Sequence, residues 1–179
     1  MTPPEFSRPV RVDTIGSEPR TIAIEAQAEE RAALARRFGL VELGRLWAEL
    51  ALTRRGAEVA AKGTLRAKAA QSCVATAEPV PEKVEARFEI VFRPAPDADG
   101  PDEEVELSGA ELDVVFYDGA TIDLGEAMAE TLALSLEPYP RAAAADAALK
   151  EAGVKSEEEA RAESSPFAVL SGLKDKLGK

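Results

Sequence analysis

The chain has 179 residues, of which 45% are hydrophobic and 31% charged, and its 33 acidic and 22 basic side chains give a net charge of −11. This length and composition are typical of a single folded domain over residues 1–179 and exclude a wholly disordered chain. The sequence has no histidine, one cysteine (Cys73), no P-loop pattern and no G-x-G-x-x-G. Ser-His-Asp and Cys-His catalysis, imidazole-ligated zinc and an internal disulfide are therefore excluded, and a non-enzymatic binding or assembly protein is favoured.

No apolar run reaches the roughly 18–20 residues that a membrane helix needs, and residues 1–20 lack a signal-peptide core. We therefore expect a cytoplasmic protein without a membrane partner. Residues 1–19 are predicted to be a loose lead-in, because three prolines fall among the first nine positions.

The first regular elements are predicted to be a short strand and a helix. Residues 20–26 alternate and contain β-branched side chains, which is typical of a strand. Residues 28–38 are rich in Ala, Glu and Arg, and Gly39 is well placed to end a helix there. In this helix Arg36 and Arg37 lie on one side.

Residues 43–54 fit either a helix or a strand. We favour the strand, because residues 58–73 alternate clearly and Arg55-Gly56 offers a turn between the two segments. With a period of two, the second strand has an apolar face and a face with three cations in succession: Lys62, Arg66 and Lys68.

A turn at residues 54–57 would make the numbers of facing residues in this hairpin sum to 111. That register pairs outward residues of the two strands: Glu49 with Lys62, Trp47 with Thr64, and Arg45 with Arg66. The first pair would attract, whereas the two arginines would repel unless an anion lay between them. For Trp47 we prefer coverage by a helix such as 28–38, since tryptophan is usually buried. The alternative is that its ring stacks an unpaired base beside the cations.

The second half continues with strands and then helices. Residues 82–93 alternate as a strand, with Lys83 and Arg87 on its polar side, and residues 112–117 form another short strand. Between them, residues 94–104 are predicted to be a solvated acidic loop. Helices are expected at 124–136, capped by Asp123 with Glu126 reaching back, at 141–153 and at 165–177. Residues 142–164 are expected to be partly mobile, because they offer few large apolar anchors.

This order of elements predicts an α+β fold. The first two-thirds of the chain would build an antiparallel sheet or a partly open barrel. Helices would lie near the N-terminal third and in the C-terminal third.

Three segments, in order, resemble the YceD family. They are residues 63–73 (GTLRAKAAQSC) with Glu78-Pro79-Val80, residues 122–130 (IDLGEAMAE) with the following segment to Pro140, and residues 165–174 (SPFAVLSGLK). Together they extend the resemblance over roughly residues 30–175. Many members of that family have a Cys-x-x-Cys pair where this chain has Cys73-Val-Ala-Thr76, so a redox or metal role for such a pair does not transfer here.

The resemblance implies a role in bacterial ribosome biogenesis. The family is named for an effect on the accumulation of large-subunit (23S) ribosomal RNA, it has relatives in plant plastids, and no enzymatic reaction is established for it. The implied partner is precursor ribosomal RNA or a large-subunit assembly intermediate.

Several candidate residues have ordinary structural interpretations. Cys73 falls on the apolar side of its strand, so we expect a buried, slowly reacting thiol and no metal. Acidic pairs such as Glu126 with Glu130 could suggest carboxylate catalysis, but 33 acidic residues produce such pairs by chance. The residues that carry the resemblance are expected to act as cap, turn, helix stops and core: Gly63, Cys73, Pro79, Asp123, Glu130, Pro140, Pro166 and Phe167.

The charge is unevenly distributed along the chain. Residues 31–68 hold nine basic and three acidic side chains. The acidic total argues against a polyanionic partner, but this local excess reopens contact with RNA as an interpretation. We expect no cofactor and no small-molecule substrate. The candidate contacts are Arg36, Arg37, Arg45, Trp47, Lys62, Arg66 and Lys68.

The alternative is an acidic adaptor that binds a basic ribosomal protein through residues 94–118 and the C-terminal helices. An RNA-binding protein should bind isolated RNA with an affinity that falls steeply with salt. An adaptor should bind no RNA but form a complex with a cationic protein. A pull-down with and without nuclease separates the two.

Overall fold

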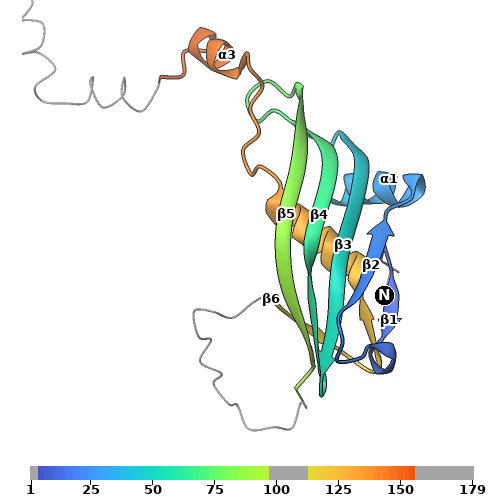
Figure 1. Cartoon of the computed structure of the whole chain (residues 1–179). Coiled ribbons are helices and arrows are strands. Elements are labelled where there is room, and N and C mark those ends of the chain that lie inside the picture. The colour runs from blue at the N-terminus through green and yellow to red at the C-terminus, as the bar shows by residue number, and fades with distance from the viewer. Residues whose placement is uncertain (1–3, 97–112, 156–179) are drawn as a thin grey trace, which may run out of the picture.

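The computed structural model describes residues 4–96 and 113–155 (Figure 1). Five strands form one sheet in the order β2-β3-β4-β5-β6, and a second sheet pairs β1 (Pro9–Arg11) with β7 (Thr121–Asp123). The large sheet comprises β2 (Arg20–Glu25), β3 (Glu42–Arg55), β4 (Glu58–Ser72), β5 (Pro79–Pro94) and β6 (Asp113–Tyr117). The helices are α1 (Ala28–Arg37), α2 (Leu124–Ser135) and α3 (Ala145–Glu151). The predicted α+β fold is confirmed, and the sheet is open.

Residues 43–54 form a strand, as favoured from the sequence. One strand differs from the antiparallel expectation, because β6 pairs with β5 in parallel. Residues 95–112 connect these two strands, which is enough chain to return to the same end of the sheet. Most of the predicted acidic loop lies outside the described residues, which resume at position 113.

The predicted register of the β3–β4 hairpin is wrong by two residues. The numbers of facing residues sum to 113 over most of the hairpin, with Arg55 opposite Glu58 and Ala51 opposite Lys62. The turn consists of two residues, Gly56 and Ala57, and the positive φ of 63° at Gly56 allows this tight connection. Since the error is even, the predicted faces remain correct: Leu46, Leu50, Val59 and Leu65 are all buried.

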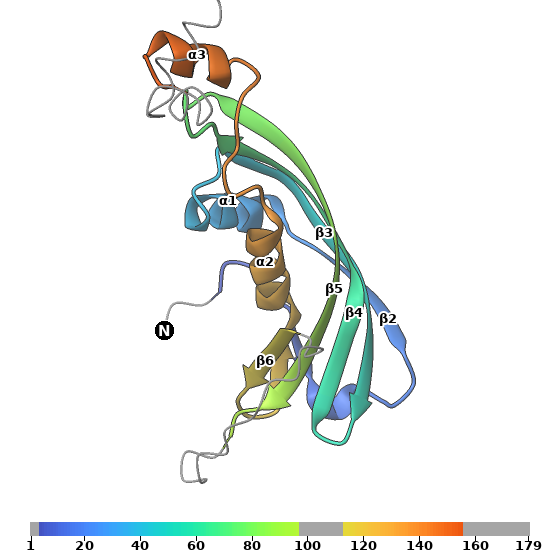
Figure 2. The ribbon, with the colours of Figure 1, turned by 90° about the vertical axis from the view of Figure 1, so that its left-hand side faces the viewer.

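The core lies between the concave face of the curved sheet and helices α1 and α2 (Figure 2). Leu34 of α1 and Met128 and Leu132 of α2 are fully buried there. No helix within residues 4–96 and 113–155 covers the convex face (Figure 2). The expectation that a helix covers Trp47 is therefore wrong: α1 packs on the concave side, and Trp47 points outward, half-buried.

The described part of residues 1–19 is packed, contrary to the expected loose lead-in. Phe6 is completely buried, and β1 (Pro9–Arg11) pairs with β7 (Thr121–Asp123). Burial of a phenylalanine and backbone pairing offset the entropy cost of ordering this segment. The proline content of the segment does not reveal either contact.

The C-terminal helices are only partly described. The helix expected over 141–153 is shorter, with α3 spanning Ala145–Glu151. Residues 156–179, with the expected helix at 165–177 and the candidates Pro166 and Phe167, lie outside the described residues.

Candidate nucleic-acid interface

The register of three long strands places three cations side by side on the convex face. Arg45 of β3 lies opposite Lys68 of β4, and Lys68 lies opposite Lys83 of β5. All three are exposed. We call these three side chains the cation row. Neighbouring strands are about 5 Å apart, so the Cα atoms from which the three side chains extend lie close together. Like charges directly opposite each other destabilise a sheet unless an anion intervenes.

The next row of outward side chains contains Trp47. Its cross-strand neighbours are Glu25 on β2 and Arg66 on β4, and Arg66 is followed by Glu85 on β5. The Arg66 guanidinium lies 5.8 Å from the centre of the Trp47 ring and 2.9 Å from Glu85. Trp47 is therefore a half-buried aromatic side chain bordered by cations. This is the arrangement expected if its ring stacks an unpaired base, the alternative to coverage by a helix.

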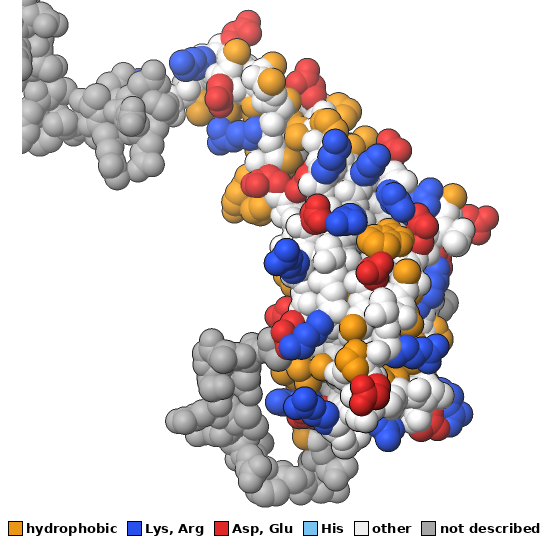
Figure 3. All heavy atoms as spheres, viewed as in Figure 1, with side chains coloured by type: hydrophobic (Ala, Val, Ile, Leu, Met, Phe, Trp, Pro, Cys, Tyr) orange, Lys and Arg blue, Asp and Glu red, His pale blue; other side chains and the backbone are white. Residues whose placement is uncertain are grey.

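Acidic side chains neutralise only part of this face. Arg45 pairs with Glu25 at 3.3 Å, and Lys62 pairs with Glu89. Within residues 4–96 and 113–155, Lys68, Lys83 and Arg87 have no ion-pair partner. Figure 3, which views the convex face, shows Lys and Arg side chains gathered over the upper parts of β3, β4 and β5. A local positive surface thus exists on an acidic protein.

Lys83 and Arg87 were not among the candidates from the sequence. The alternation of residues 82–93 already places both on the polar side of their strand. Only the register between β4 and β5 shows that Lys83 extends the cation row.

Arg36 and Arg37 are not part of this surface, contrary to the sequence-based grouping. Both belong to α1, on the opposite side of the sheet (Figure 2). Arg37 donates to Glu126 of α2 at 2.6 and 2.9 Å and to Glu5 at 3.1 Å. These carboxylates raise the pKa of Arg37 and join α1, α2 and the N-terminal segment, which gives Arg37 a structural role.

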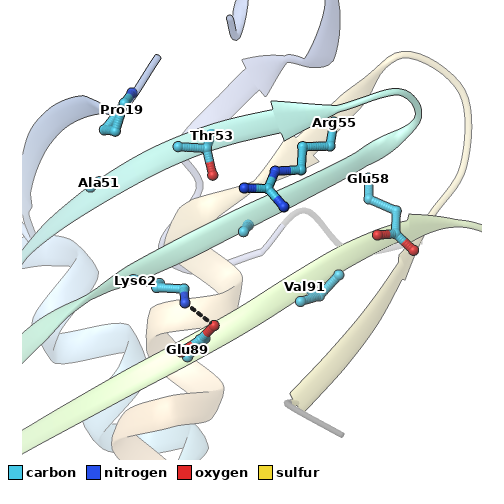
Figure 4. A pocket seen from close by; sticks show the side chains of 9 residues that line it. Pro19, Ala51, Thr53, Arg55, Glu58, Lys62, Glu89 and Val91 are labelled. Carbon is cyan, nitrogen blue, oxygen red and sulfur yellow. Dashed lines mark ion pairs between the residues drawn. The ribbon is translucent and has the colours of Figure 1, made fainter. Parts of the chain in front are cut away.

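A shallow hollow of about 390 Å³ lies on the convex face near the β3–β4 turn (Figure 4). Lys62 and Glu89 lie along it and pair with each other, while Arg55 and Glu58 border its other end. Glu58 in turn accepts from Arg93 at 2.8 Å. Since most of its charges are already paired, this hollow offers less to a charged ligand than the cation row does.

Gly63, which carries part of the resemblance, permits the close contact of β3 with β4 behind this face. A Cβ at position 63 would lie 2.7 Å from the Cα of Leu50 and closer still to the carbonyl oxygen of Glu49. These are backbone atoms, so no side-chain movement could make room. Gly63 therefore has a structural reason to be glycine.

Cys73, Pro79 and Pro140 meet at the far end of the β4–β5 hairpin. Pro79 begins β5 opposite Ser72, and the buried Pro140 accepts a hydrogen bond from the Val74 N–H at 2.9 Å. The Ala142 N–H donates to the Cys73 sulfur at 3.2 Å. Together these contacts anchor the chain after α2 to the hairpin.

Cys73 is buried, as its position predicts, but its thiol is not electrostatically ordinary. The N–H of Ala142 and the side chain of Thr76 lower the pKa of Cys73 to about 7. The slow reaction expected for this thiol remains a prediction that rests on its burial. Residues 4–96 and 113–155 contain no cluster of three or more potential metal ligands.

Asp123 caps α2, as predicted. Its carboxylate accepts from the N–H groups of Gly125 and Glu126 at 2.9 and 3.2 Å, and from the Arg8 N–H at 2.7 Å. Glu126 pairs with Arg37 instead of reaching back to the cap. Glu130 is exposed on the outer side of α2.

Comparison with known proteins adds one finding. A family model described as "Large ribosomal RNA subunit accumulation protein YceD" matches residues 61–174, which is more than half of the chain. No curated protein and no solved structure matches. Lys62, Gly63, Arg66, Lys68 and Lys83 lie inside the matched range. None of the described helices is long and apolar enough to cross a membrane.

Proposed function

The chain belongs to the YceD family of large ribosomal RNA subunit accumulation proteins, and on this premise we propose that it is a non-catalytic assembly factor that binds precursor 23S ribosomal RNA. The binding surface in this proposal is the convex face of the sheet. The observation that carries it is the cation row of Arg45, Lys68 and Lys83, which crosses three strands.

The energetics of the cation row support a polyanionic partner. Adjacent cations on neighbouring strands weaken the free protein, so a ligand that places phosphates between them is favoured by the charges it brings together. Each neutralised phosphate also releases condensed counterions. Distant acidic residues contribute little at physiological salt, because the Debye length is only about 8 Å.

The alternative partner is a basic ribosomal protein bound by acidic residues. Most of the surface predicted for that role, residues 94–118 and the C-terminal helices, lies outside the described residues. Nothing in the described part favours this function, so it enters here as an outcome of the test.

The test compares two variants that each lose three positive charges. The row variant replaces Arg45, Lys68 and Lys83 with Ser. The control replaces three exposed cations away from the convex face, Arg36, Arg141 and Lys150, with Ser. Each variant loses one exposed arginine ion pair, Arg45–Glu25 or Arg141–Asp146, so the two are matched in that respect as well.

Binding to 23S precursor RNA is measured as a function of salt, with urea unfolding to confirm that both variants fold. We expect the row variant to lose about two units of the slope of log K against log salt, since each phosphate contact to single-stranded RNA contributes roughly 0.7. The control should keep the wild-type slope. Equal losses in both variants would contradict the convex face as the site. A complex with ribosomal protein that survives nuclease, without RNA binding, would establish the adaptor instead.

A further inference from the structure

A second hollow lies on the convex face directly beside Trp47. Its volume is about 290 Å³, and its wall includes Trp47, Glu49, Lys62, Thr64 and Arg66. Leu50 and Gly63 also line it. The hollow therefore combines an aromatic wall with two cations, a carboxylate and a hydroxyl group.

Glu49 is the unusual member of this set. The sequence predicts that it pairs with Lys62, but the actual register places it opposite Ala23 and Thr64. Lys62 pairs with Glu89 instead. The side chain of Glu49 is exposed and has no hydrogen-bond or ion-pair partner within residues 4–96 and 113–155. Its carboxylate is therefore available to accept hydrogen bonds from a ligand.

We propose that this hollow binds one unpaired, amine-bearing nucleobase of a single-stranded RNA segment, a conclusion that rests on the proposed function. The base stacks on Trp47, and Glu49 accepts a hydrogen bond from its exocyclic amine. Phosphates next to that nucleotide lie on the cation row.

The spacing of the sheet supports this arrangement. Arg45 and Trp47 are two residues apart on the same strand, so the cation row lies about 7 Å from the tryptophan. Arg66, at 5.8 Å from the ring centre of Trp47, borders the same hollow, and its guanidinium can contact a phosphate of the bound nucleotide. One nucleotide thus meets an aromatic group and cations at the same time.

The chemistry selects the type of RNA. A base in a duplex is stacked between its neighbours and paired at its edge, so only an unpaired base can enter the hollow. Cytosine and adenine present an amine that a carboxylate accepts from, whereas a carbonyl oxygen at that position, as in uracil, would repel it. The hollow should therefore prefer cytosine and adenine over uracil.

The test uses the fluorescence of Trp47, which is the only tryptophan in the chain. The full chain is titrated with oligo-C, oligo-A and oligo-U of about 12 nucleotides and with a duplex of the same length, and labelled RNA reports total binding by anisotropy. We expect quenching by oligo-C and oligo-A, about tenfold weaker binding of oligo-U, and no quenching by the duplex.

Variants separate stacking from amine recognition. Trp47→Ala should weaken oligo-C binding about 5- to 100-fold, and Trp47→Phe should retain part of the affinity, which guards against misfolding of the alanine variant. Glu49→Gln should remove most of the preference for cytosine over uracil, because an amide both donates and accepts. Glu18→Gln, which removes an exposed carboxylate elsewhere, should keep that preference.

The outcomes distinguish this inference from the proposed function. RNA binding with unchanged Trp47 fluorescence, or with equal affinity in Trp47→Ala, would overturn the base site while the assembly role stands. Equal binding of the duplex, or of oligo-U, would also overturn it. Absence of any RNA binding by the wild-type chain would overturn the proposed function itself.

Discussion

Replacing the middle cation of the row should stabilise the free protein. Lys68→Gln keeps a flexible polar side chain at this position, but the positive charge opposite Arg45 and Lys83 disappears. The matched control is Lys62→Gln, the same substitution on the same strand and face. Lys62 has an anionic partner, Glu89, so its replacement should have the opposite sign.

The magnitude follows from Coulomb's law in water. Two charges whose side chains splay to about 7 Å repel by roughly 0.6 kcal/mol at a dielectric constant near 80. Screening in 0.1 M salt, with a Debye length of about 10 Å, halves this value approximately. Lys68 has two such neighbours, and Glu25 offsets part of the charge of Arg45, so Lys68→Gln should raise the free energy of unfolding by about 0.4–0.5 kcal/mol. Lys62→Gln should lower it by up to about 0.5 kcal/mol, the usual value of an exposed ion pair.

Urea unfolding monitored by circular dichroism measures both changes. At low salt the Lys68→Gln midpoint should move up by about 0.2–0.3 M, given a slope near 2 kcal/mol per molar urea. In about 1 M salt, where the Debye length falls to about 3 Å, both variants should unfold with the wild type. A loss of stability in Lys68→Gln, or a gain that persists at high salt, would refute the conclusion that the row is strained by like charges.

The other predictions concern the residues that hold the fold in place. Gly63→Ala should cost about 3–5 kcal/mol in urea unfolding, because its Cβ meets backbone atoms, whereas Gly44→Ala, with its nearest contacts at 3.6 Å, should change stability by less than about 1 kcal/mol. The hydrogen-bonded guanidinium of Arg8 lowers the pKa of Glu30 below its ordinary value of 4.5. The stabilisation of the fold by this pair is therefore present above that pH and is lost as the pH falls further. Glu30→Gln should therefore cost about 1 kcal/mol at pH 7, with the gap to wild type closing in acid, and Glu29→Gln should follow the wild-type profile. The Cys73 thiolate should titrate near pH 7 by its ultraviolet absorbance yet alkylate slowly in the folded protein; titration at the ordinary value for cysteine would contradict the hydrogen bonds to its sulfur.

The local features of this fold could be predicted from the sequence because they depend on near neighbours along the chain. The strand at residues 58–73 follows from its alternation, which also identifies the buried face with Val59 and Leu65. Asp123 as a helix cap follows from its place before the helix. The ordered motifs identified the family, and the family model confirms it.

Contacts between distant segments were predicted less well. The prediction of a loose lead-in at residues 1–19 took no account of Phe6. The burial of Phe6 depends on helix α2, which lies more than a hundred residues later in the chain. Arg37 has the positive charge typical of an RNA contact, but only the packing of α1 near α2 brings it to Glu126. A single sequence contains no signal for such pairs, since charge and hydrophobicity do not specify which partner a side chain meets.

The sequence by itself determined the α+β class, the five strands of the large sheet, the two faces of the hairpin and the family. Alternation is a local property of an extended backbone, and it survives any register error of two residues. Only the tertiary structure decided which side chains lie next to one another on those faces. That choice depends on the two-residue turn at Gly56 and on the pairing of β4 with β5, and these brought Lys83 to Lys68 and left Glu49 unpaired beside Trp47.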